Sequence, residues 1–346
     1  MEPTHMIQSL KDAYPHRIIT IDSHTAGEPT RLIVSGIDPF PAGLSMHQKR
    51  EYFMQNYDHV RRQITREPRG HRDMFAAFLT EPVTLGAHFG LIYMDPRRYP
   101  FLCGHATMGA VKTLITADAI AIEGGETAII VDTPSGPMET RVYGDAGCIR
   151  SIGIRMVPSF VLHDHQTLHL PELGLISVAT VCVGGFFVMV SAQELDLAWK
   201  PENRARFIDL GMKVIDAANQ QLTVRHPTRP EVSSVDVAEF YDPQGEGHRK
   251  GQSMVIYGEA HMDRSPCGTG TAAKMTLLHH RKQLNLQEPF VNTSPLGTQF
   301  EGRLISTTTI GKTPAVIAEI RGSAHITGIH DFILDPDDPF QNGYLL

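Results

Sequence analysis

The sequence predicts a mixed α/β protein built from two similar domains. Two stretches, Cys103-Gly-His-Ala-Thr107 and Cys267-Gly-Thr-Gly-Thr271, carry cysteine, glycine and threonine at the same offsets. Strand-like runs precede them at residues 90–94 and 253–257, and helical runs follow at 108–117 and 272–284. A related turn comes after each helix, at 131–136 and 291–297. This matching order over a long segment indicates a duplicated unit.

Strands around a helical segment are expected in the first half. Residues 17–36 alternate between apolar and polar about a turn at Gly27, which predicts a strand hairpin. Ser45 with Gln48 three positions later is a capping-box pattern, and it predicts a helix that runs to about Arg66. Strands are predicted again over 68–94 and 128–160.

A second copy is expected after Val157-Pro158, so that residues 1–157 form the first domain and 158–329 the second. The apolar run 178–190 resembles the start of this copy. A helix is predicted near Pro201, because apolar residues from Phe207 to Leu222 follow a helical stripe. The polar, glycine-rich loop 242–252 is expected to be exposed and mobile, and strands return after Pro289.

Composition narrows the class of protein. The chain has 346 residues, 41% hydrophobic and 20% charged, which describes an ordinary globular protein. Its net charge of -7 argues against a nucleic-acid partner. The longest apolar run is too short to span a bilayer, and the N-terminal residues 1–14 lack the apolar core of a signal peptide. Four cysteines suggest no disulfide framework, so we expect a reducing, cytoplasmic location.

Each repeated cysteine stands where a helix is expected to begin. Unpaired backbone N–H groups and the positive end of the helix dipole face outward there, which lowers the pKa of a thiol and attracts a carboxylate. Two such domains facing each other would bring both thiols to one cleft, as a two-base proton exchange at a carbon atom requires. For either stretch alone, a glycine-rich turn around an inert cysteine is the simpler interpretation.

Six segments of the sequence resemble those of the proline racemase family, which includes 4-hydroxyproline 2-epimerases and trans-3-hydroxyproline dehydratases. They span almost the whole chain, and the Asp263–Thr271 segment, Asp-Arg-Ser-Pro-Cys-Gly-Thr-Gly-Thr, is the most specific. The six are residues 22–28, 67–75, 103–105, 184–187, 263–271 and 335–339.

The resemblance implies a fold like that of diaminopimelate epimerase. Each domain would be a curved, mostly antiparallel sheet around a central helix that begins at its cysteine, with the active site in the cleft between the domains. The tail, residues 330–346, would return to the first domain. The implied activity is that of an isomerase that interconverts L- and D-proline without a cofactor, and a homodimer is expected.

The expected site combines two proton-transfer groups with a substrate clamp. Cys103 and Cys267 would be the acid and the base. The resemblance implies that Asp263 binds the substrate ammonium and that His105 orients or tunes Cys103, although an Asp-Arg turn and a helix-start histidine are simpler readings. The carboxylate would be bound by backbone N–H groups of Gly104, His105, Gly268 and Thr269. No pyridoxal lysine, nucleotide fingerprint or paired metal-ligand motif is visible in the sequence.

Two aromatic residues bear on substrate choice and favour different answers. Phe75 stands where racemases of this family carry an aromatic residue that fills the space of a ring hydroxyl. Tyr257 replaces the racemase phenylalanine and offers a phenol to a hydroxyl. We therefore expect proline, with 4-hydroxyproline as the alternative. A dehydratase of 3-hydroxyproline is disfavoured, because that branch commonly has threonine in place of Cys267. Cys148 and Cys182 are expected to be structural.

Overall fold

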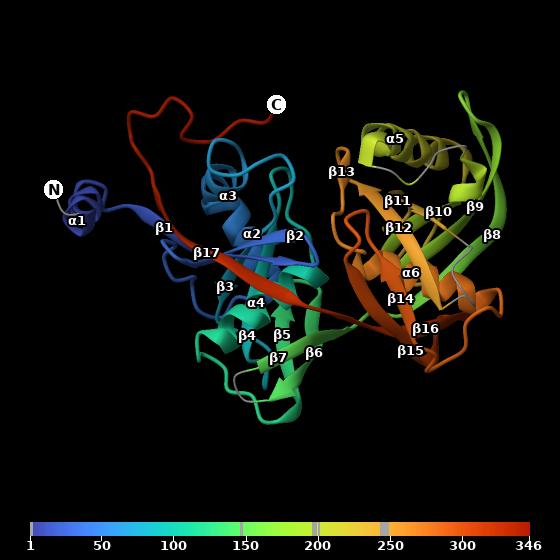
Figure 1. Cartoon of the computed structure of the whole chain (residues 1–346), viewed down its shortest axis with the longest axis horizontal. Helices are drawn as coiled ribbons and strands as arrows, with labels where there is room; N and C mark the ends of the chain where they lie inside the picture. The colour runs from blue at the N-terminus through green and yellow to red at the C-terminus, as the bar shows by residue number, and fades with distance from the viewer. Residues whose placement is uncertain (1–2, 146–147, 196–198, 200, 243–248) are drawn as a thin grey trace. The chain divides into compact units, whose positions relative to one another are not determined.

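The computed structural model describes residues 3–145, 148–195, 199, 201–242 and 249–346. These residues divide into two compact units. The first contains residues 1–25, 29–152 and 323–346, and the second contains residues 26–28 and 153–322. Each unit combines strands and helices, so the predicted mixed α/β class is confirmed (Figure 1).

The first unit is a sheet with helices packed against it. β2 pairs parallel with β3, β4 parallel with β5, and antiparallel pairs join β1 to β17, β3 to β4, and β5 to β6. The helix α4 packs against β1 and β17. The elements are α1 (Pro3–Ala13), β1 (Arg17–Thr25), β2 (Glu28–Ser35), α2 (Met46–Asn56), α3 (Asp58–Thr65), β3 (Ala76–Thr80), β4 (Phe89–Met94), α4 (Gly104–Thr116), β5 (Gly125–Thr133), β6 (Gly136–Asp145), β7 (Cys148–Arg155) and β17 (Ala324–Ile333).

The second unit repeats this pattern. β10 pairs parallel with β11 and β12 parallel with β14, while antiparallel pairs join β9 to β10, β11 to β12, and β14 to β15. The helix α6 packs on β8, β9, β15 and β16. The elements are β8 (Ser159–Leu170), β9 (Gly174–Val183), β10 (Gly185–Ser191), η1 (Ala192–Glu194), η2 (Pro201–Asn203), α5 (Arg204–Gln221), β11 (Val235–Tyr241), β12 (Lys250–Tyr257), β13 (His261–Met262), α6 (Gly268–His280), β14 (Phe290–Thr293), β15 (Gln299–Ile310) and β16 (Thr313–Gly322).

The two units share one order of elements. In each unit, a pair of strands is followed by a helical segment and then by two more strands. The cysteine comes next, followed by a helix and a further pair of strands. The parallel and antiparallel pairings fall at the same places in this order. The duplication predicted from the cysteine stretches is thus present in the topology, and both sheets are mostly antiparallel as expected.

Apolar side chains hold the flanking helices to the sheets. In the first unit Phe53 and Ile64, from α2 and α3, are buried with Ile33 and Ile92 of the strands. In the second unit a core cluster joins α5 to β11 and β12, through Phe207, Val214, Phe240 and Ile256. The stripe predicted from Phe207 onward is therefore the buried face of α5. These cores fix the strands that lead into Cys103 and Cys267.

Two details differ from the sequence-based expectations, and a third expectation falls mostly outside the described residues. The capping box at Ser45 forms as predicted, but the single helix to Arg66 divides into α2 and α3 at Tyr57. The backbone of Tyr57 leaves the helical conformation (φ −126°, ψ 17°), and its ring packs against Phe53. The polar N-terminal segment contains the helix α1, which was not predicted. Most of the loop expected over 242–252 lies outside the described residues.

The C-terminal tail belongs to the first unit. Tyr344 forms a bridge with Glu67, and the Arg69 guanidinium donates to Asp338 at 3.0 Å. Arg69 also donates to the carbonyl of Gln341. The tail therefore packs on the segment that contains residues 67–75.

Candidate active site

Cys103 is the N-cap residue of α4, directly before its first turn. Its backbone is extended (φ −155°, ψ 120°), and its carbonyl accepts the Thr107 hydroxyl at 2.7 Å and the Thr107 N–H at 3.1 Å. The phenol of the buried Tyr93 lies 2.6 Å from the Thr107 hydroxyl. Burial raises the pKa of Tyr93, so this phenol stays neutral. The neutral Tyr93 phenol therefore stabilises the first turn of α4 through its hydrogen bond to Thr107.

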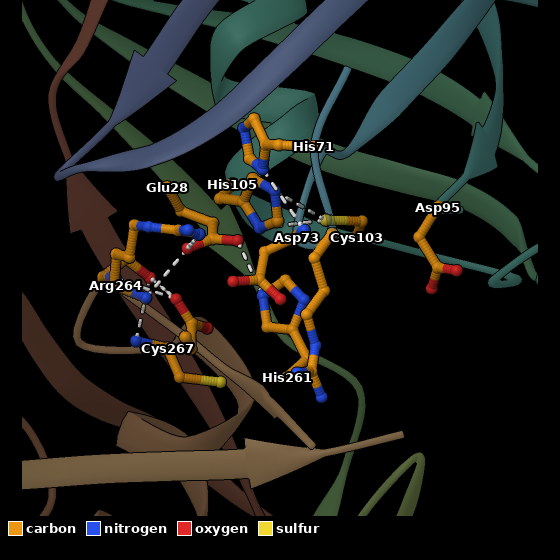
Figure 2. Close-up of polar contacts among 12 residues, drawn as sticks. Glu28, His71, Asp73, Asp95, Cys103, His105, His261, Arg264 and Cys267 are labelled. Atoms are coloured by element: carbon orange, nitrogen blue, oxygen red, sulfur yellow. Dashed lines mark hydrogen bonds and ion pairs between the residues drawn. The ribbon is translucent and has the colours of Figure 1, made fainter. Parts of the chain in front are cut away.

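His105 lies against the Cys103 thiol. Its Nδ1 atom is 3.2 Å from Sγ of Cys103. Figure 2 marks the contact between these two residues with a dashed line. The His105 carbonyl accepts the Thr25 hydroxyl at 2.8 Å, and the Phe75 ring meets the imidazole edge to face with centroids 4.8 Å apart. An imidazole at this distance can take the thiol proton and leave a thiolate. The structure thus brings Cys103, His105 and Phe75 together in the first unit.

Cys267 is the N-cap residue of α6, but its surroundings differ. Its backbone has φ +58° and ψ 119°, a conformation that residues other than glycine rarely adopt. The Gly270 N–H donates to Sγ at 3.3 Å, and the Thr269 hydroxyl lies 3.4 Å from the same atom. Gly268 and Thr269 occupy the first two positions of α6. The start of the helix therefore faces the thiol, as the sequence predicts.

The pKa of Cys267 contradicts the expectation that a helix start lowers it. Burial raises this pKa well above its usual value, and the nearby Asp263 raises it further. The bonds from Thr269 and Gly270 act in the opposite direction but are smaller. The sequence shows the helix start but not the depth of burial. Cys267 is therefore held as a neutral thiol, which suits a proton donor.

Asp263 lies in the turn that leads to Cys267. One of its oxygens accepts the Ser265 N–H at 2.8 Å and the Ser265 hydroxyl at 2.7 Å, and the Ser265 hydroxyl oxygen in turn accepts the Cys267 N–H at 3.0 Å. Burial, followed by the charge of Glu28, raises the pKa of Asp263 to about 7. The carboxylate would therefore gain from a cation, and a substrate ammonium is a suitable one.

Glu28 and His261 lie beside Asp263 and were not predicted. Glu28 is fully buried; its two oxygens meet His261 Nε2 at 2.9 Å and the Arg264 N–H at 2.8 Å. Figure 2 shows Glu28 linking these two residues. The Tyr257 ring stacks on the His261 ring with centroids 4.5 Å apart. The only signal in the sequence is that Glu28 ends the family-like segment 22–28.

The other two cysteines have no comparable setting. Cys182 is buried in β9, and burial raises its pKa to about 12. Cys148 is exposed at the start of β7. In the part of the chain that the structure describes, no three His, Cys, Asp or Glu side chains gather so that they could hold a metal ion. None of the described helices is long and apolar enough to cross a membrane.

Comparison with known proteins identifies the family. Residues 20–345 match the family model described as proline racemase. A proline racemase from Clostridioides difficile is 37% identical over 333 residues, 96% of this chain and 99% of that protein. A 4-hydroxyproline 2-epimerase from Streptosporangium roseum is 35% identical over 326 residues, 94% of this chain and 97% of that protein.

A solved structure agrees with these relatives. The crystal structure of a hydroxyproline epimerase from Agrobacterium vitis, with bound trans-4-hydroxy-L-proline, matches with a TM-score of 0.86 and 26% identity. The match covers 96% of each chain. The chain therefore belongs to the proline racemase family, and it is an enzyme of the isomerase class, a racemase or epimerase.

Proposed function

We propose that this enzyme interconverts L- and D-proline without a cofactor, using Cys103 and Cys267 as the two proton-transfer groups. The observation that carries the proposal is the duplication: each thiol is the N-cap residue of the helix that follows the matching strands of its unit, β3 and β4 before α4, and β11 and β12 before α6. Two copies of one thiol-bearing element suit a reaction in which a proton leaves one face of a carbon and another arrives at the opposite face.

The surroundings of the two thiols favour different protonation states, which supports this chemistry. The imidazole 3.2 Å from Cys103 can hold the proton that the thiol gives up, whereas the raised pKa of Cys267 keeps its proton in place. The Cys103 thiolate would remove the α-proton, and the electron pair left on the α-carbon would delocalise into the carboxylate. The Cys267 thiol would then deliver its proton to the other face. The opposite enantiomer would use the same steps in reverse.

Binding groups for both ends of an amino acid are available. We propose that backbone N–H groups of Gly104, His105, Gly268 and Thr269, at the starts of α4 and α6, bind the carboxylate. These groups would also stabilise the charge that builds up there in the transition state. Asp263, whose pKa of about 7 leaves it ionised above neutral pH, would pair with the ammonium.

Phe75 favours proline over a hydroxylated ring. Its ring is buried and fixed against His105, next to Cys103. A fixed phenyl ring beside the reacting thiol leaves an apolar wall for the substrate. A 4-hydroxyl group placed there would be buried without a hydrogen-bond partner, at a cost of about 1–3 kcal/mol.

Tyr257 supports a second candidate, 4-hydroxyproline 2-epimerase. Its ring lies on His261 in the half of the site that contains Asp263. A phenol that reached the substrate could bond a ring hydroxyl and offset the cost at Phe75. We give Phe75 more weight, because reorienting a hydrogen bond does not relieve a steric clash. Dehydration of 3-hydroxyproline is disfavoured by the cysteine at position 267.

Polarimetry on L-proline and trans-4-hydroxy-L-proline, run side by side on the same enzyme sample, tests the proposal. The optical rotation of L-proline should be lost, and kcat/KM for proline should be higher than kcat/KM for epimerisation of trans-4-hydroxy-L-proline. Faster epimerisation of 4-hydroxyproline would establish the second candidate. We also propose a reducing, cytoplasmic location, since both thiols must stay reduced. We further propose a homodimer, which light scattering during gel filtration tests.

A further inference from the structure

We propose that Asn292 is a positioning residue for Cys267, and that Ser253 and Glu239 hold the Asn292 amide in its working orientation. Asn292 lies in β14, Ser253 in β12 and Glu239 in β11, all in the second unit. All three side chains are buried, with exposed fractions of 0%, 1% and 0%.

The strained backbone of Cys267 needs such support. A non-glycine residue at φ +58° persists only where its surroundings enforce the conformation. On the C-terminal side, the Cys267 carbonyl accepts the Thr271 N–H at 2.8 Å. On the N-terminal side, the Pro266 carbonyl accepts from the Asn292 amide at 3.1 Å and from the Thr271 hydroxyl at 3.1 Å. Asn292 thus fixes the peptide that precedes Cys267.

A buried chain of hydrogen bonds fixes the direction of the amide. The Ser253 hydroxyl lies 2.6 Å from Glu239 Oε1 and donates its single hydrogen there. Its oxygen then accepts from Asn292 Nδ2 at 3.1 Å. The same nitrogen lies 2.9 Å from the Thr271 hydroxyl. The Pro266 carbonyl can only accept, so the NH₂ side of Asn292 must face it. The Ser253 oxygen lies 3.1 Å from both Nδ2 and Oδ1 of this amide and holds it there through contact with both atoms.

The matching positions of the first unit do a different job. Asp132 is the next-to-last residue of β5, as Asn292 is of β14, but it accepts the N–H groups of Val83 and Thr84, each at 2.7 Å. Thr107, four residues after Cys103, donates to the Cys103 carbonyl. Cys103 is correspondingly extended, at φ −155°. The support from Asn292 is therefore specific to the second half of the duplication.

The orientation of Cys267 has a chemical consequence. The Gly270 N–H reaches Sγ at 3.3 Å and opposes the rise in the pKa of Cys267. The titratable groups around the thiol are Asp263, in the preceding turn, and Glu239, on β11, and the ionised form of each raises this pKa. Lys274 of α6 is buried beside Glu239. If the backbone relaxes, the bond from Gly270 is lost and the pKa of Cys267 rises further.

The test measures alkylation of each cysteine in the full chain by iodoacetamide, between about pH 6 and pH 10, with peptides quantified by mass spectrometry. In Asn292→Leu, a neutral change of similar size, the apparent pKa of Cys267 should rise by about one unit, which lowers its thiolate fraction about tenfold at a given pH. Cys103 serves as the internal control and should not change. Racemisation should fall by on the order of 10²-fold.

Two further variants complete the test. Ser253→Ala removes the hydroxyl that orients the amide, and it should shift Cys267 in the same direction; it decides the matter if Asn292→Leu does not fold. Tyr93→Phe removes the hydrogen bond between Tyr93 and Thr107 at the start of α4 and should leave Cys267 unchanged. Equal shifts at both cysteines in Asn292→Leu, or no shift at Cys267 in a folded variant, would overturn the proposal.

This inference rests on the role proposed for Cys267, but the two can fail separately. Alkylation requires no racemisation. An unchanged Cys267 profile would therefore refute the positioning role alone, while a wild-type enzyme inactive toward both proline and 4-hydroxyproline would refute the proposed function alone.

Discussion

The buried Glu239 should make the stability of the second unit depend on pH. Its carboxyl is fully buried and accepts one hydrogen bond, from Ser253. Burial raises its pKa from 4.5 to about 8, although the Lys274 charge and Ser253 lower it in part. Between these two values the folded state keeps the proton and the unfolded state releases it. The stability contributed by Glu239 is therefore fully present below about pH 4.5 and is lost as the pH rises from there through about 8.

The size of the effect follows from the same values. Each pH unit within this window changes the free energy of unfolding by about 1.36 kcal/mol. From about pH 5 to about pH 8 the wild-type protein should lose about 4 kcal/mol more than Glu239→Gln, which cannot ionise but still accepts from Ser253. Burial lowers the pKa of the neighbouring Lys274 to about 8 and the charge of Glu239 raises it, so the difference between the two proteins reports on the buried Glu239–Lys274 pair.

Trp199, the one tryptophan of the chain, provides the assay. Its ring packs on Phe207 of α5, 5.4 Å between centroids, so its fluorescence reports on the second unit. Urea unfolding followed by this signal should give diverging stability curves for wild type and Glu239→Gln. Glu319→Gln, which removes a buried carboxylate bound by Arg321, should keep the wild-type slope. Parallel curves for wild type and Glu239→Gln would refute a neutral buried Glu239.

Three further outcomes concern the reaction. Phe75→Val should narrow the preference for proline over 4-hydroxyproline, measured as the ratio of kcat/KM values; an unchanged ratio would remove Phe75 from substrate selection. Asp263→Asn should lower kcat/KM by roughly 10- to 100-fold. The wild type should show a rise in kcat/KM as Asp263 ionises around pH 7, and Asp263→Asn should abolish it; a retained rise would assign that titration elsewhere. Cys148→Ser and Cys182→Ala should racemise proline near the wild-type rate, and loss of activity in either folded variant would bring a third thiol into the mechanism.

Local patterns in the sequence revealed the duplicated architecture. The strands before Cys103 and Cys267 and the helices after them follow from hydrophobic periodicity and turn residues, which act over a few positions. The break at Tyr57 could not be predicted, because residues 46–65 contain no glycine or proline that would mark the end of a helix.

In the candidate site, contacts between residues close in sequence could be predicted, and contacts between distant residues could not. Cys267, Thr269 and Gly270 are close in sequence, so their contacts could be anticipated. Glu28 meets His261 across 233 positions, and no pattern in the chain links them. The pKa of Cys267 was predicted in the wrong direction, because its burial depends on distant segments.

Racemisation of L-proline by the two single variants Cys103→Ser and Cys267→Ser tests the central claim most directly. A serine hydroxyl in place of either thiol removes an effective acid or base, and such groups contribute roughly 10²–10⁴-fold to the rate. Optical rotation should therefore persist with each folded variant under conditions in which the wild-type enzyme racemises the sample fully. Near-wild-type loss of rotation with either variant would contradict the two-cysteine mechanism.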